Sequence, residues 1–169
     1  MRYLYFLLFI FNFSHSQSDI FNIARKGTVE ELKKLIEENK SLVNTPNNAG
    51  FSPLIIATYS SNLHVAKYLL NIAEDINYQS PEGTVLMAAI MRNNIDMVNL
   101  LLDKEANIEI TNDNGVTPLM LAIQFKNIEI IKLLLKNNAN KAAIDKEGKT
   151  TFEYAVATKE ETIIQLFKN

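Results

Sequence analysis

The chain has 169 residues, of which 47% are hydrophobic and 21% are charged, and its formal net charge is −2 at pH 7. This is the composition of an ordinary folded protein, and the slightly acidic balance gives no basic face for nucleic acid. The sequence contains no cysteine, which excludes disulfides and thiolate metal sites.

The first eighteen residues have the plan of a secretory signal peptide. A short positive start is followed by an apolar stretch at residues 3–13 and by small polar residues at 14–18. The apolar stretch is shorter than the roughly 20 residues that a membrane-spanning helix needs. We therefore expect cleavage before Gln17 or Asp19, and an exported protein, periplasmic or extracellular, with no stable membrane anchor after cleavage. An apolar first helix packed on the rest of the chain is the alternative.

From residue 20 onward, one phrase recurs about every thirty-three residues. A glycine begins it, a hydroxyl residue and often a proline follow, and an alanine ends it. The glycines are Gly50, Gly83, Gly115 and Gly148, and the alanines are Ala57, Ala89, Ala122 and Ala155. A fixed period of this length is typical of stacked repeats, in which each repeat covers the apolar face of its neighbour.

Each repeat is predicted to contain a turn, a helix, a short link and a second helix. The first helix begins at a hydroxyl residue followed by proline, as in Ser52-Pro53 and Thr117-Pro118. The second helix follows a Ser, Asn or Lys link and has apolar residues at i+3 and i+4 spacing, as at residues 128–135. The third repeat is one residue shorter and lacks the proline, so we expect its turn to be short or distorted. The predicted repeats are residues 19–46, 47–79, 80–111, 112–144 and 145–169, within one domain at 19–169.

The two end repeats are predicted to be caps, because a terminal repeat must shield the array from water with a polar outer face. The charged residues that indicate this are, in the first repeat, Glu30, Lys33, Lys34, Glu37 and Glu38 and, in the last, Lys159, Glu160, Glu161 and Lys168.

These phrases resemble the ankyrin repeat, whose pattern is roughly G-x-T-P-L-H-x-A, then G-H-x-E-I-V-x-L-L-L, then G-A. The resemblance covers residues 20–169 and implies an all-α solenoid of about five helix-turn-helix units, two caps and three internal repeats, with projecting turns. The histidine of the pattern is replaced by Ile55, Met87, Met120 and Glu153. The hydrogen bond that this histidine usually makes to the turn is therefore expected to be missing.

The sequence has no motif for catalysis or for metal binding. Its carboxylate pairs, such as Glu37 and Glu38, are neighbours on solvated helices and cannot face each other across a cleft. The run Asn112-Asp113-Asn114-Gly115 lacks the ligand spacing of a calcium loop. His64, the single histidine after residue 18, has no second imidazole or thiol to complete a metal site. We therefore expect a protein that is not an enzyme and that uses no metal or cofactor.

The resemblance implies a protein-binding surface on a concave face, formed by the ends of the first helices and by the turns. Aromatic residues, Met and Arg are enriched at the centres of interfaces. The candidate partner-binding residues are Arg25, Phe51, Tyr59, Met91, Arg92 and Phe125. The alternative, which the sequence leaves equally open, is that Tyr59, Met91 and Phe125 pack sideways between adjacent helices and expose little.

The sequence thus predicts an exported, non-catalytic protein-interaction module that is monomeric when isolated. Its partner is expected to be another protein and not nucleic acid. The alternatives are a secreted effector, a toxin-neutralising immunity protein or an accessory subunit of an enzyme. The abundance of Asn, Ile and Lys favours a bacterial source.

Overall fold

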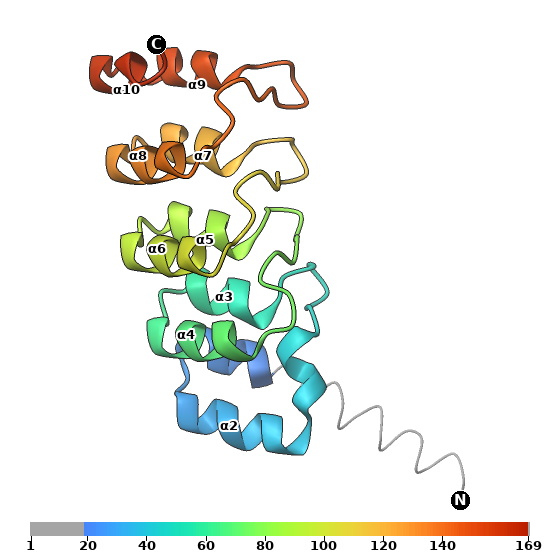
Figure 1. Ribbon diagram of the computed structural model, residues 1–169. Helices are drawn as coiled ribbons and strands as arrows, with labels where there is room; N and C mark the ends of the chain where they lie inside the picture. Colours follow the sequence, from blue (N-terminus) through green and yellow to red (C-terminus); the bar gives the residue numbers. More distant parts are fainter. Residues whose placement is uncertain (1–18, 169) are drawn as a thin grey trace, which may run out of the picture. The chain divides into compact units, whose positions relative to one another are not determined.

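The computed structural model describes residues 19–168 as helices joined by short turns (Figure 1), which confirms the predicted all-α ankyrin fold. The predicted signal peptide, residues 1–18, lies outside the described residues. The chain divides into two compact parts, an N-terminal part that ends at Asp75 and a C-terminal part that begins at Ile76. No helix between residues 19 and 168 combines the length and the hydropathy of a membrane span.

The N-terminal part contains two repeats. Residues 19–26 are helical, and they are followed by α2 (Val29–Glu38), the 3₁₀ helix η1 (Lys40–Asn44), α3 (Pro53–Tyr59) and α4 (Leu63–Ile72). Thr28 and Glu31 form a capping box at the start of α2, since each side chain accepts a hydrogen bond from the other's backbone N–H. The Asn62 amide donates to the carbonyl oxygens of Ile23 and Gly27, at 3.2 and 2.9 Å, and so joins the second repeat to the first.

The C-terminal part contains three helix pairs. They are α5 (Val85–Met91) with α6 (Ile95–Asp103), α7 (Pro118–Gln124) with α8 (Ile128–Lys136), and α9 (Thr151–Ala157) with α10 (Glu161–Gln165). Helix α7 packs against α5 on one side and α9 on the other, and α8 packs against α6. The core therefore lies between successive pairs, as expected for stacked repeats.

The turn before α5 is shorter than the others, as predicted. In the turn before α7, the N–H of Asn112 donates to the carbonyl of Val116, whereas Ser80 pairs with Gly83, one residue closer. The Thr84 hydroxyl at the start of α5 does not cap the helix, and it is buried without a hydrogen-bond partner. The third repeat thus has a tighter turn than the others, and its first helix lacks a side-chain hydrogen bond at the N-cap.

The turns of the C-terminal part are joined to one another through their backbones. The N–H of Asp113 donates to the carbonyl of Pro81 at 2.9 Å, and the N–H of Lys146 donates to the carbonyl of Asn114 at 3.0 Å. These bonds fix each projecting turn against its neighbour.

The outer faces of the two end repeats differ. The charged residues predicted on the first repeat are exposed on α2, and those predicted on the last repeat are also exposed. However, the last repeat also exposes Phe152 and Val156 of α9, by 42% and 46%. The prediction of a polar outer face therefore holds for the first repeat but describes the last one incompletely.

Candidate protein-binding site

A sharp corner follows the first helix in each repeat after the first. The residue at this corner has a positive φ although it is not glycine: 59° at Ser61, 53° at Asn93, 55° at Lys126 and 59° at Lys159. Such left-handed backbone reverses the chain within a few residues. The residues just before the corner are therefore held at the end of the helix, at the edge of the repeat.

Three predicted site residues lie in the N-terminal part, in three different segments. Arg25 is exposed near the end of the first helical segment, and its guanidinium donates to the carbonyl of Phe21 at 3.3 Å. Phe51 is half-buried in the turn before α3. Tyr59, the last residue of α3, is 50% exposed. The other three residues belong to the C-terminal part.

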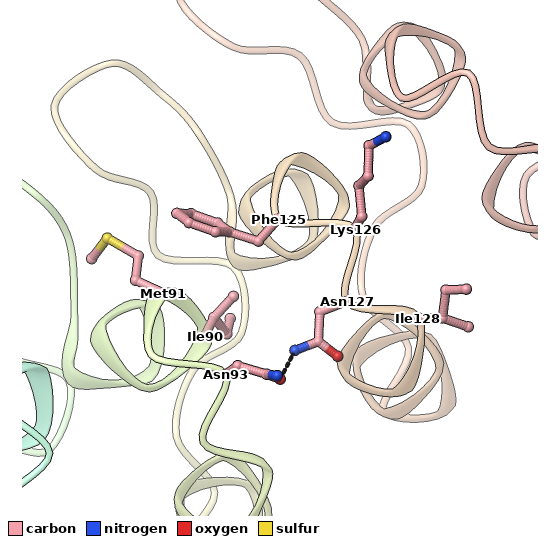
Figure 2. Close-up of a pocket in the computed structure, with 7 residues that line it drawn as sticks. All are labelled: Ile90, Met91, Asn93, Phe125, Lys126, Asn127 and Ile128. Atoms are coloured by element: carbon pink, nitrogen blue, oxygen red, sulfur yellow. Dashed lines mark hydrogen bonds between the residues drawn. The ribbon is translucent and has the colours of Figure 1, made fainter.

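Two of the predicted residues in the C-terminal part share a pocket. Met91 ends α5 and Phe125 follows α7, and both line a pocket of about 260 Å³ (Figure 2). The other lining residues are Ile90, Asn93, Lys126, Asn127 and Ile128. Phe125 is 53% exposed, Met91 is half-buried, and the adjacent Arg92 is exposed. The alternative, in which these side chains expose little, is thus wrong for Phe125 and Tyr59 and correct in part for Met91.

Polar groups hold the rim of this pocket in place. The Asn127 amide nitrogen donates to the side-chain oxygen of Asn93 (Figure 2), and its oxygen accepts from the N–H of Ile130 at 3.1 Å. One side chain therefore caps α8 and also joins two repeats. Lys126 pairs with Glu160 at 3.0 Å, with both side chains about half exposed, and such surface pairs contribute only about 0–1 kcal/mol.

The pocket is suited to holding side chains of a partner protein. Its volume lies below the roughly 300–1,000 Å³ typical of small-molecule sites. Aromatic and thioether groups offer apolar contact area, while the lysine and amides at the rim offer hydrogen bonds. Within residues 19–168, no three His, Cys, Asp or Glu side chains are grouped to hold a metal ion.

The sequence prediction missed the polar rim of the pocket. Asn93 and Lys126 stand where the ankyrin pattern has glycine, in the link that precedes the second helix of their repeats. The replacement of this glycine by a polar or charged residue could have indicated the rim, because such a residue places a side chain at a corner where the pattern has none.

The last turn, another predicted contact region, is held by Asp145. Its carboxylate accepts from the Tyr154 hydroxyl at 2.6 Å and from the N–H groups of Glu147 and Lys149 at 2.9 Å each. The tyrosine hydrogen bond, followed by that from Lys149, holds the pKa of Asp145 below its usual value. Burial, together with the hydrogen bond to Asp145, raises the pKa of Tyr154 to about 12.

These shifts predict the pH dependence of stability. Because the pKa of Tyr154 is raised, the stability that its protonated hydroxyl contributes is fully present below the ordinary tyrosine pKa, about 10. This stability is lost as the pH rises toward 12. Because the pKa of Asp145 is lowered, the stability that its carboxylate contributes is present above the ordinary aspartate pKa and is lost as the pH falls through the lowered value.

We expect Tyr154→Phe to lower the free energy of unfolding at neutral pH and to reduce the loss of stability at alkaline pH, as measured by urea unfolding from neutral pH to pH 11. Tyr59→Phe is the control, and equal alkaline losses in the wild type and Tyr154→Phe would contradict the assignment.

Comparison with known proteins agrees with this architecture. A family model described as ankyrin repeats (3 copies) matches residues 86–169, and one described as ankyrin repeats (many copies) matches residues 20–70. Ankyrin repeat and SAM domain-containing protein 6 of Rattus norvegicus is 32% identical over 101 residues, which are 59% of this chain and 11% of that protein.

Two further relatives match shorter segments. The ANK repeat-containing protein nipk-1 of Caenorhabditis elegans is 36% identical over 93 residues, 52% of this chain and 15% of that protein. Alpha-latrocrustotoxin-Lt1a of Latrodectus tredecimguttatus is 34% identical over 64 residues, 38% of this chain and 4% of that protein. The chain thus spans a small part of the length of each relative. This chain belongs to the ankyrin-repeat family, as is shown by its repeat phrase, its stacked helix pairs and both family models.

Proposed function

We propose that this protein is a non-catalytic protein-interaction module whose partner inserts an apolar side chain beside Phe125. The observation that carries the proposal is the half-exposed Phe125 ring next to Met91, in a pocket between the ends of α5 and α7. Large apolar groups of this kind form the energetic centre of most protein interfaces. Ankyrin repeats generally mediate binding to other proteins, which supports this use of the pocket.

Neighbouring residues would add specificity. Arg92 is exposed directly after Met91, and a guanidinium makes strong paired hydrogen bonds to a partner carboxylate. In the N-terminal part, Arg25, Phe51 and Tyr59 are proposed to play the same roles, at equivalent helix ends and in the first turn.

The proposed module acts outside the cytoplasm of the producing cell. Support comes from the order of positive, apolar and small polar residues at positions 1–18, which is the order in secretory signal peptides. The partner is therefore to be sought among periplasmic or extracellular proteins.

The test is a quantitative comparison of variants. The chain would be used to capture a partner from exported fractions of the producing organism, and the affinity for that partner would then be measured. Phe125→Ala is expected to weaken binding by about 2 kcal/mol or more, a factor of about 30, because a central aromatic residue is lost. Ile144→Ala is the matched control, because Ile144 is 60% exposed but does not line the pocket. Unchanged affinity for Phe125→Ala would remove the pocket from the interface.

A further inference from the structure

The turn before α7 contains the single Asn-Gly pair of the sequence, Asn114-Gly115. The Asn114 side chain is exposed, and its amide forms no hydrogen bond within residues 19–168. Its backbone, in contrast, is held on both sides. The N–H of Asn114 donates to the side-chain oxygen of Asn112 at 3.0 Å, and its carbonyl accepts from the N–H of Lys146 at 3.0 Å. An unrestrained amide therefore stands on a backbone that joins two turns.

An asparagine followed by glycine carries the chemistry of deamidation. Once the Gly115 nitrogen has lost its proton, it can attack the side-chain carbonyl carbon of Asn114 and close a cyclic imide. The bond from that carbon to the amide nitrogen breaks, and this nitrogen takes up a proton and leaves as ammonia. Glycine favours the attack because it has no Cβ atom to hinder the approach.

Water then opens the imide at one of its two carbonyl groups. Cleavage at the former side-chain carbonyl gives aspartate and restores the ordinary backbone. Cleavage at the former main-chain carbonyl gives isoaspartate, in which the backbone runs through the Cβ atom. The main-chain carbonyl of Asn114, which accepts from Lys146, then becomes part of a free carboxylate on a branch.

The closed turn holds the reaction back. The N–H of Gly115 donates to the carbonyl of Asn112 at 2.9 Å, which is the hydrogen bond that closes the turn. The Asn112 side chain supports this closure, because its oxygen accepts from the N–H groups of Asn114 and Val116 at 3.0 and 3.1 Å. The Gly115 nitrogen is therefore engaged in the closed turn, and it becomes available for attack when the turn opens.

We propose that Asn114 is a site of self-modification, at which opening of the turn controls deamidation and isoaspartate formation releases this turn from the next one. The residue that precedes the glycine in the other turns is Ala49, Glu82 or Glu147. Because two of these residues are acidic, the aspartate product is compatible with the turn. The isoaspartate product is the disruptive one, since it lengthens the backbone and displaces the acceptor for Lys146. This proposal is independent of the proposed function, which uses the pocket at α5 and α7.

Peptide mapping by mass spectrometry tests the site and its control. The 169-residue chain is incubated at neutral pH, folded or in urea, and the exchange of NH for O is followed at each asparagine. Asn114 is expected to react fastest in urea, and to react at least about tenfold more slowly in the folded chain, because the turn must first open locally. Faster exchange at another asparagine in urea, or equal rates for Asn114 in the two states, would overturn the proposal.

Two matched variants separate opening of this turn from general loosening. Asn112→Ala removes the side-chain acceptor and is expected to speed deamidation of Asn114 in the folded chain but not in urea. Asn47→Ala is the control, because the Asn47 oxygen makes the same pair of bonds in the first turn, to the N–H groups of Ala49 and Phe51. It should leave the rate at Asn114 unchanged, and equal effects of the two variants would contradict control by this turn.

The consequence for the array is tested on the separated products. Chromatography resolves the isoaspartyl chain from the aspartyl chain, which Asn114→Asp also provides. The isoaspartyl chain is expected to unfold at a lower urea concentration than the wild type, whereas Asn114→Asp should unfold close to the wild type. The same midpoint for both products would mean that isoaspartate does not release the turn.

Discussion

Replacing Ile123 with alanine is expected to lower the free energy of unfolding by about 3 kcal/mol. Ile123 lies on α7 and is 0% exposed, and α7 packs against both α5 and α9. Removal of a large aliphatic side chain from such a position loses its burial and leaves a cavity that neighbouring helices fill only in part. Because each helix pair supports the next, the loss is expected to affect the C-terminal part as a whole.

The matched comparison for Ile123 is the same repeat position in the last pair. Val156 is 46% exposed, so Val156→Ala should lower the free energy of unfolding by less than about 1 kcal/mol. Urea unfolding, followed by circular dichroism at one fixed low protein concentration, measures both variants. Equal losses would mean that burial by the following repeat is not what distinguishes the two positions.

The positions of turns and helices could be predicted because their signals are local. The hydroxyl of Thr117 accepts from the N–H of Met120 at 3.1 Å, and Pro118 is the first residue of α7, as the sequence indicated. The shortened third turn was also predicted, because a missing residue in a fixed period is visible in the sequence. Caps and turns involve only a few neighbouring residues, so tertiary packing changes them little.

The exposure of individual side chains could not be predicted in the same way. Met91 and Phe125 stand at similar helix ends, but one is half-buried and the other is 53% exposed, because exposure depends on the neighbouring repeat. The hydrogen bond between Asn127 and Asn93 joins two corners that are 34 residues apart in the sequence, and no local pattern indicates it. Phe152 and Val156 have the same apolar character as their buried counterparts, so residue type alone does not reveal that they are open.

Gly115→Ala is expected to lower the free energy of unfolding by about 3 kcal/mol, through two effects that can be separated. Gly115 has a φ of +77°, a conformation that disfavours any residue with a Cβ atom. An added Cβ would also lie 2.8 Å from the backbone nitrogen of Lys146 and 3.3 Å from the Cα of Asp145. That nitrogen donates to the carbonyl of Asn114, so the clash acts on the bond that joins two turns.

Gly148→Ala isolates the first effect from the second. Gly148 has a φ of +83°, close to that of Gly115, but its added Cβ would meet no atom within 4 Å. It is therefore expected to lower the free energy of unfolding by only about 1 kcal/mol, the strain of left-handed backbone alone. The difference between the two variants in urea unfolding then measures how much the contact between adjacent turns contributes. Equal losses would mean that the turns move apart freely, and that the backbone bonds between them add little to the rigidity of the array.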